Sequence, residues 1–140
     1  MIKESPKTIK YGRCFRLKIK NKDIRSAFLN VKNYKYGLKA LEYGWITSLQ
    51  LNSILRLIKI ILKKKIKIKV NCSLIIPITK KPLETRMGSG KAERKFWRCP
   101  IRKGMILFEL SSVSELDAYF IFYVIGHRLS FLTKKVKLIF

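Results

Sequence analysis

Residues 79–91 read Thr-Lys-Lys-Pro-Leu-Glu-Thr-Arg-Met-Gly-Ser-Gly-Lys, and their types and spacing are suited to binding chemistry. The stretch is basic, contains two glycines and has no apolar period, which predicts an exposed loop. Glycine lets a backbone approach a ligand closely, and lysine acts on phosphate as a point charge. Arg86 is the candidate for a directed contact, because a guanidinium binds phosphate through two nitrogens or stacks on bases. The competing interpretation is a flexible loop with solvated charges.

The end of this stretch, Gly88-Ser89-Gly90-Lys91, superficially resembles the phosphate-binding loop of nucleotide-hydrolysing enzymes. That motif requires a glycine five positions before its last glycine, where this chain has Thr85, and Ser or Thr after the lysine, where it has Ala92. A strand-like segment at 96–99 also stands where the motif needs a helix. The spacing therefore argues against nucleotide hydrolysis.

Other catalytic and metal-binding patterns are missing from the sequence. Cys14, Cys72 and Cys99 are widely spaced, and His127 lies in a separate apolar segment, so neither a zinc site nor a catalytic triad is indicated. Three cysteines so placed do not indicate a disulfide framework, and we expect free thiols that are buried or half-exposed. We expect no metal, no cofactor and no enzymatic activity.

The charge of the chain predicts a polyanionic partner. Lysine and arginine number 32 against 8 acidic residues, which gives a net charge of +24 in only 140 residues. The 48% hydrophobic content supports a folded core in one domain, but the charge opposes compaction through self-repulsion. Nucleic acid, an anionic membrane surface and an acidic protein are all candidates. No apolar run approaches the roughly 20 residues that cross a bilayer, so we expect no membrane insertion, and the N-terminus lacks the pattern of a secretory or import signal.

The elements that would position the loop begin with a helix. Thr47 and Gln50 have the spacing of a capping box, and apolar residues then recur at three- and four-residue steps. This pattern predicts an amphipathic helix of about 17 residues. The lysine run at 63–65 suits either the negative end of that helix or contact with RNA. Before the helix, residues 36–44 predict a strand with Leu38, Ala40 and, as a third candidate, Glu42 on one face, followed by a turn at Gly44.

The second half of the chain is predicted to contain more strands and a second helix. Residues 66–70 alternate between β-branched residues and lysine, which is typical of a half-buried strand whose lysine face is either solvated or in electrostatic contact. Residues 74–78 follow, and Pro77 suggests either the end of a ladder or an edge strand there. Residues 96–99 and 105–110 suggest an antiparallel hairpin turning at Gly104. Ser114 predicts the start of a helix through the apolar segment 116–129, and 131–140 is a candidate last strand.

Several separated motifs closely resemble the family of ribosomal protein L-sixteen of the bacterial-type large subunit. Besides 79–91, they are Tyr36-Gly-Leu-Lys-Ala-Leu, Gly44-Trp-Ile-Thr, Phe96-Trp97 and Gly104-Met-Ile-Leu-Phe-Glu109, in unchanged order. The resemblance implies an α+β domain with two helices packed on a mostly antiparallel β-sheet, here residues 36–140, preceded by a basic N-terminal arm at 1–35.

The resemblance also implies the partners. They are large-subunit rRNA, tRNA in the aminoacyl site near the peptidyl-transferase centre, and neighbouring large-subunit proteins. Arg86 matches an arginine that is hydroxylated in some bacterial members. The implied rRNA- and tRNA-binding residues are Lys10, Arg13, Lys80, Lys81, Arg86, Met87, Gly88, Ser89, Gly90, Lys91, Arg94 and Lys95. A free-standing RNA-binding protein or a protein of anionic membrane surfaces is the alternative.

Some features depart from the family pattern. Upstream of Tyr36 only Tyr11-Gly12-Arg13 matches well, Ala92 stands where glycine is common, and Asn71-Cys72-Ser73 replaces an aromatic-proline turn. Lysine outnumbers arginine more than two to one, and Ile, Asn, Phe and Tyr are plentiful, as AT-rich coding produces. These features predict a member encoded in a mitochondrial genome and located in the mitochondrial matrix, with plastid or bacterial origin as the alternative.

Overall fold

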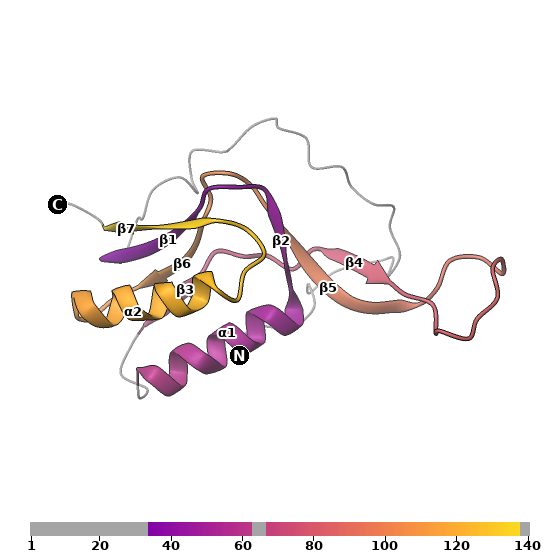
Figure 1. The fold of residues 1–140 in the computed structure, drawn as a ribbon, viewed down its shortest axis with the longest axis horizontal. Helices are drawn as coiled ribbons and strands as arrows, with labels where there is room; N and C mark the ends of the chain where they lie inside the picture. Colours follow the sequence, from indigo (N-terminus) through magenta and orange to yellow (C-terminus); the bar gives the residue numbers. More distant parts are fainter. Residues whose placement is uncertain (1–33, 63–66, 138–140) are drawn as a thin grey trace.

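The computed structural model describes residues 34–62 and 67–137, in which two helices cover antiparallel sheets (Figure 1). This arrangement confirms the predicted α+β class. The strands form a four-stranded sheet in the order β3-β6-β1-β7 and a three-stranded sheet in the order β2-β5-β4. The elements are β1 Tyr36–Ala40, β2 Gly44–Thr47, α1 Ser48–Ile61, β3 Ile68–Val70, β4 Ile76–Thr79, β5 Arg94–Ile101, β6 Ile106–Leu110, α2 Glu115–Gly126 and β7 Thr133–Lys137.

A bent antiparallel ribbon links the two sheets. β1 pairs with β6 in one sheet and β2 pairs with β5 in the other, so each sheet contains one half of the ribbon. The bend lies between the pairs Lys39–Ile106 and Gly44–Ile101. The chain covers the same number of positions from residue 39 to 44 as from residue 101 to 106. At the bend the Ala40 amide donates to the Met105 carbonyl at 2.9 Å. The register therefore continues across the corner.

Two sequence predictions at this corner are wrong. Segments 96–99 and 105–110 do not form a hairpin, because β5 and β6 lie in different sheets. Gly104 does turn the chain, with a φ of 87°, but its amide donates to the Ala40 carbonyl at 2.7 Å and so directs the chain onto β1. Gly44 does not form a turn before the helix, since it begins β2. Both corrections have one cause: each strand finds its partner far away in sequence.

Helix α1 begins as its sequence predicts. The Gln50 amide donates to Thr47 Oγ1 at 3.2 Å, and the Thr47 amide donates to Gln50 Oε1 at 3.0 Å, which completes the capping box. The apolar stripe then places Leu51, Ile54 and Ile58 in the core with no exposed surface. The helix ends at Ile61, and the lysine run at 63–65 lies outside the described residues.

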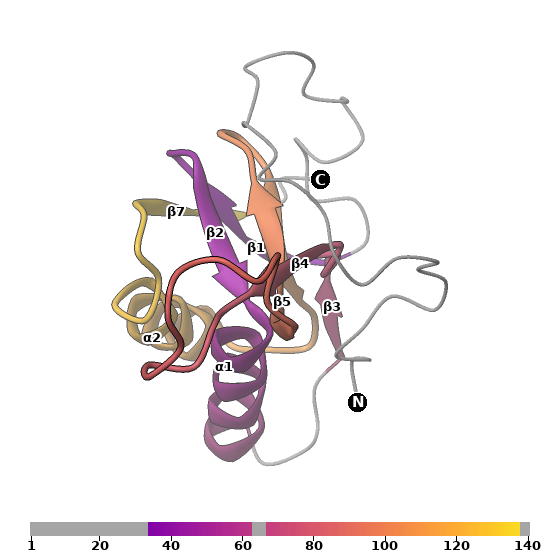
Figure 2. The same cartoon turned by 90° about the vertical axis from the view of Figure 1, so that its right-hand side faces the viewer.

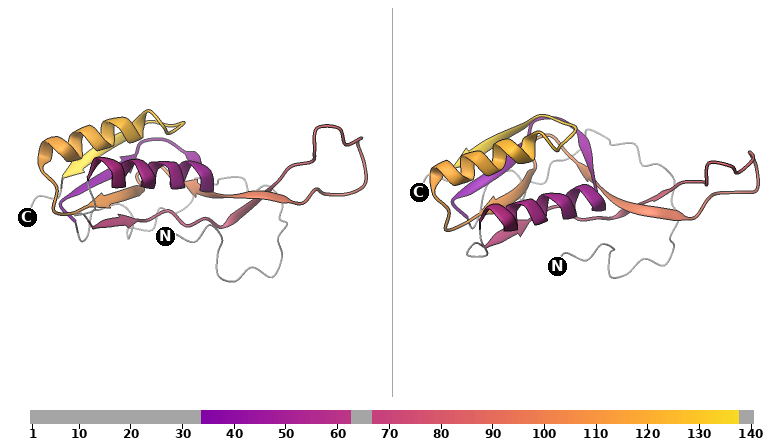
Figure 3. Two further views of the ribbon diagram at one scale, coloured as in Figure 1. Left: turned by 90° about the horizontal axis from the view of Figure 1, so that it is seen from below. Right: turned by 60° about the horizontal axis from the view of Figure 1, so that its bottom comes forward.

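Helix α2 and β7 confirm the predictions for the end of the chain. Ser114 caps α2 by accepting a 3.1 Å hydrogen bond from the Asp117 amide. The helix is apolar on most of its faces, and Ala118, Ile121 and Ile125 lie on the side that is buried. β7 pairs antiparallel with β1. Figure 3 shows α1 and α2 side by side on the same side of the strands.

The remaining strand predictions are partly confirmed. Residues 68–70 form the half-buried strand β3, and Pro77 lies in β4 at the edge of its sheet. Glu42 is exposed and lies beyond β1, unlike Leu38 and Ala40, which are buried. Cys72 and Cys99 are buried free thiols, whereas Cys14, together with the rest of the predicted arm up to residue 33, lies outside the described residues.

Candidate nucleic-acid interface

The basic loop protrudes from the body of the fold. Residues 80–93 connect the antiparallel strands β4 and β5 and extend beyond the rest of the described chain (Figure 1). The Lys80 amide donates to the Glu93 carbonyl at 3.4 Å and closes the base of the loop. Residues 82–91 are all exposed, and Leu83 and Met87 have 98% and 102% of their surface open. Two fully open apolar side chains at the end of an antiparallel stem are typical of a segment that contacts a partner.

The tip of the loop has an unusual backbone. Gly88, Ser89 and Gly90 have φ values of 99°, 53° and 75°, three left-handed residues in succession. A Cβ added at either glycine would meet no atom within 4 Å. The glycines are therefore required by the backbone conformation and not by crowding. Lys81 Nζ donates to the Gly88 carbonyl, which ties one side of the loop to the tip. Figure 2 views the molecule from the loop side.

The surroundings of the loop argue against nucleotide chemistry. The chain after Lys91 enters strand β5 at Arg94, whereas a phosphate-binding loop needs a helix whose N-terminus faces the phosphates. The described residues contain no group of three or more His, Cys, Asp or Glu side chains that could hold a metal ion. The loop offers charges and open backbone to a ligand.

The structure brings most of the sequence-predicted residues together. Arg94 and Lys95 begin β5 directly below the loop, and both are exposed. The Arg94 guanidinium lies 4.9 Å from the centroid of the Trp97 ring, which holds it at the loop base. Lys10 and Arg13 lie outside the described residues. The predicted residues within the loop are Lys80, Lys81, Arg86, Met87, Gly88, Ser89, Gly90 and Lys91.

The sequence did not reveal a second contact between an arginine and an aromatic ring, which lies on the sheet next to the loop. The Arg98 guanidinium stacks 3.7 Å from the centroid of the Trp45 ring. The two residues lie on the paired strands β5 and β2, and both are half-buried. The signal in the sequence was the alternation along β5, where Phe96 and Arg98 interleave with the buried Trp97 and Cys99. An arginine and aromatic rings therefore continue from the loop onto the sheet.

The sequence profile of one protein family covers this whole arrangement. The profile described as Ribosomal protein L16p/L10e matches residues 6–136, including the loop, both helices and both sheets. The chain belongs to this family. As an L16p/L10e protein it is a non-enzymatic, structural protein of the large ribosomal subunit, with ribosomal RNA among its partners. The match begins at residue 6, well before the Tyr36 start that the sequence motifs indicated.

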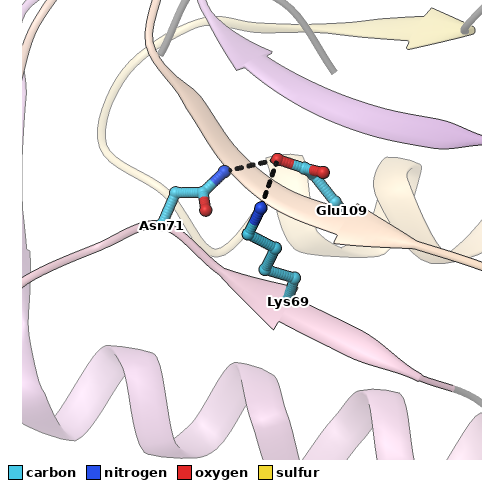
Figure 4. Close-up of polar contacts among 3 residues, drawn as sticks. All are labelled: Lys69, Asn71 and Glu109. Carbon is cyan, nitrogen blue, oxygen red and sulfur yellow. Dashed lines mark hydrogen bonds and ion pairs between the residues drawn. The ribbon is translucent and has the colours of Figure 1, made fainter. Parts of the chain in front are cut away.

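One lysine of this L16p/L10e protein, Lys69, pairs with a buried carboxylate of the same chain. Lys69 Nζ lies 4.0 Å from Oε1 of Glu109, whose side chain is 2% exposed, and Asn71 Nδ2 donates to the same oxygen at 2.7 Å (Figure 4). A buried carboxylate needs such partners because desolvation of an unpaired charge is costly. The sequence left the lysine face of β3 either solvated or in electrostatic contact. For Lys69 the structure shows an electrostatic contact, and its partner is Glu109 of the same chain.

Two further findings concern membranes and thiols. None of the helices in the described part of the chain is long and apolar enough to cross a membrane.

The thiols of Cys72 and Cys99 affect each other's pKa. Cys99 raises the pKa of Cys72, with burial adding to the rise, and Cys72 lowers the pKa of Cys99. Cys72 Sγ also lies 3.9 Å from the Leu107 carbonyl, so this thiol helps to pack the connection after β3 against β6.

Proposed function

We propose that this L16p/L10e protein binds rRNA and lines the aminoacyl-tRNA site near the peptidyl-transferase centre, with the 80–93 loop directed toward bound tRNA. The observation that carries the proposal is the tip of the loop: three successive left-handed residues, fully exposed, among basic side chains. Such a tip presents backbone amides and cations to a phosphate backbone without the bulk of Cβ atoms at its glycines.

The loop residues have different roles in this proposal. Lys80, Lys81 and Lys91 neutralise backbone phosphates as point charges, and Gly88 and Gly90 supply the tip conformation. Lys81 keeps two further N–H donors after its bond to Gly88. Arg86 makes the directed contact near tRNA because its planar guanidinium fits phosphate or stacks on a base. Met87 and Ser89 contact RNA beside it, as do Arg94 and Lys95 at the base.

The N-terminal part completes the RNA contacts in this proposal. Residues 1–35 form a basic arm, with Lys10 and Arg13 on rRNA, and residues 36–140 form the α+β domain. The family match that starts at residue 6 supports a role for the arm within the same particle.

We assign the particle to the mitochondrial matrix, with the chain encoded in the organelle genome. The excess of lysine over arginine and the abundance of Ile, Asn, Phe and Tyr support this assignment, because AT-rich codons specify these residues. Sedimentation of a tagged chain from purified mitochondria tests it, and recovery only in cytoplasmic or plastid particles would contradict it.

Sedimentation at rising salt tests the ribosomal role. A chain integrated by many phosphate contacts and by packing should stay with the large-subunit fraction at salt concentrations that remove peripheral basic proteins. Release at low salt would favour the alternative, a free-standing RNA-binding or membrane-surface protein. Flotation with anionic vesicles separates those two: a chain that floats at low salt and does not sediment with subunits is a membrane-surface protein.

A further inference from the structure

The outer face of α2 is unlike the rest of this basic molecule. Residues 104–127 contain no lysine or arginine, although these make up 32 of the 140 residues. On α2 the side chains of Leu116, Tyr119, Phe120 and Tyr123 are 84%, 62%, 56% and 56% exposed. Glu115 and Asp117 are exposed in its first turn. Phosphate contacts do not account for an apolar face with acidic residues at its end.

This face borders a groove. An open cavity of about 550 Å³ lies between α2 and β7, and α2 runs beneath β7 in Figure 1. Its walls are mainly aromatic and apolar on the helix side and basic on the strand side. The lining residues that matter here are Tyr119, Tyr123, His127, Leu132, Lys134 and Lys135.

The strand that forms one wall has an open edge. β7 is the last strand of its sheet, and among the described strands only β1 pairs with it. The Leu41 amide donates to the Leu132 carbonyl at 2.9 Å, so Leu132 directs its backbone groups toward β1. Because an antiparallel ladder alternates, Thr133, Lys135 and Lys137 direct theirs to the open edge. Three successive outward positions can thus bond another strand.

Lysines often protect an edge strand from pairing, but two of these are already engaged. Lys137 Nζ forms a 2.9 Å ion pair with Glu115, and the Lys135 ammonium lies over the Tyr119 ring. Both contacts draw the side chains toward α2 and away from the edge. Lys134 is exposed and lines the groove, so the groove attracts carboxylates at its rim.

We propose that the groove between α2 and β7 binds an extended segment of a neighbouring protein, which adds a strand to the open edge of β7. Alternate apolar side chains of that segment pack against Tyr119 and Tyr123 on the α2 side, and a carboxylate on the opposite face of the segment lies beside Lys134. A second copy of this chain is a poor occupant, because two molecules of charge +24 repel each other. RNA lacks the alternating amides and carbonyls that match a strand edge. The inference rests on the proposed function in one respect, that the neighbour belongs to the same subunit.

Amide hydrogen exchange at single-residue resolution tests the added strand. The full chain is compared free and within purified large subunits. The amides of Thr133, Lys135 and Lys137 should exchange about tenfold or more slowly in the subunit. Lys134 and Val136 face β1 in both states and serve as internal controls. Unchanged exchange at the three outward amides within the subunit overturns the proposal, whereas absence of the chain from subunits overturns the proposed function instead.

Photo-crosslinking identifies the occupant. A benzophenone amino acid replaces Tyr123 in chains assembled into purified subunits, and the crosslinked product is sequenced by mass spectrometry. The proposal is supported if the crosslinked peptide alternates apolar and polar residues, as a strand with one apolar face does, and if it contains acidic residues. Crosslinks to rRNA, to a helical segment or to a second copy of this chain overturn it.

A matched pair of variants tests the backbone bond itself. Lys135→Pro and Lys135→Ala both remove the ammonium, but only proline removes the outward amide, at a position where an edge strand tolerates it. Circular dichroism first confirms that both variants fold. Without crosslinking, Lys135→Pro should then retain the neighbour that crosslinking identified about fivefold more weakly than Lys135→Ala does, as expected for the loss of one hydrogen bond. If Lys135→Pro does not fold, Thr133→Pro against Thr133→Ala replaces the pair. Equal retention by the two folded variants of either pair contradicts the added strand.

Discussion

The side-chain amide of Asn71 donates a 2.7 Å hydrogen bond to Oε1 of the buried Glu109, and so joins the residue after β3 to β6 (Figure 4). The Asn71 backbone amide reinforces this link by donating to the Leu107 carbonyl at 3.0 Å. Glu109 lies in segment 104–109, which carries part of the family resemblance, whereas Asn71 stands where that resemblance leads one to expect an aromatic-proline turn. A departure from the pattern thus supplies the partner of a buried carboxylate.

Loss of this bond should destabilise the protein. Asn71→Ala leaves the buried Glu109 with only Lys69 at 4.0 Å, so the free energy of unfolding should fall by about 2 kcal/mol, as for hydrogen bonds to charged groups. Urea unfolding followed by circular dichroism measures the change. Ser73→Ala, at an exposed position nearby, is the control and should change it by less than about 0.5 kcal/mol. Equal stability of the two variants would show that Glu109 does not depend on Asn71.

Gly44 should not tolerate a side chain. A Cβ at this position would lie 2.3 Å from Cδ1 of Phe131, which is itself buried. Gly44→Ala should therefore lower the free energy of unfolding by about 1–3 kcal/mol through overpacking, and Phe131→Leu in the same chain should recover part of the loss. Thermal unfolding compares these variants with Gly126→Ala, where the nearest atom is Thr133 Oγ1 at 3.4 Å. Similar effects of the two alanines would contradict a clash at Gly44.

Arg86 should matter more for tRNA than for assembly. Its side chain is exposed in the loop and distant from the core, so Arg86→Ala leaves the fold intact, and in the proposed function it removes the directed contact. We expect normal incorporation into subunits but slower tRNA accommodation, by about tenfold, the effect of losing one charge-assisted hydrogen bond. Sedimentation and pre-steady-state tRNA binding measure the two quantities. Arg56→Ala on α1 controls for the loss of one exposed arginine, and parallel losses of assembly and accommodation would refute the division of roles.

The pair Glu115–Lys137 should give a pH-dependent and salt-sensitive coupling. Lys137 lowers the pKa of Glu115 from its ordinary 4.5, and Glu115 raises the pKa of Lys137 from its ordinary 10.5. The Glu115 contribution is present above 4.5 and is lost as the pH falls through the lowered value. The Lys137 contribution is present below 10.5 and is lost as the pH rises through the raised value.

A double-mutant cycle with Glu115→Gln and Lys137→Met measures this coupling. It should be present near neutral pH, disappear as the pH falls through the lowered pKa of Glu115, and weaken in about 1 M salt, because both side chains are exposed and screened. Coupling that persists after Glu115 is protonated would mean that the two side chains interact by packing and not by charge.

Elements with local signals were predictable from the sequence. Thr47 with Gln50, and Ser114 with Asp117, cap their own helices over three residues, and the apolar stripe of α1 requires only its own periodicity. The 80–93 loop was recognisable for the same reason, since glycines and charges without apolar spacing have no core to join. For Pro77 the missing amide left two alternatives, the end of a ladder or an edge strand, and the structure places β4 at the edge of its sheet.

Long-range relations were not predictable from these signals. The pairing of Gly44 with Ile101, the stack of Arg98 on Trp45 and the bond from Asn71 to Glu109 each join residues far apart in the chain, and many registers satisfy the same local pattern. The local preference around Gly104 even favoured a hairpin that does not form, because β6 pairs with β1 and β5 pairs with β2 instead.

The sequence by itself determined the helices with their caps, the exposed basic loop, the need for an anionic partner and the absence of a nucleotide-binding motif, because each follows from residue types within a few positions. Only the tertiary structure decided that the strands divide into two sheets joined by a bent ribbon, that Lys69 lies beside a buried carboxylate, and that the apolar face of α2 lies beside an open strand edge. Those features depend on which distant strands pair, and pairing is chosen by the packing of the whole chain.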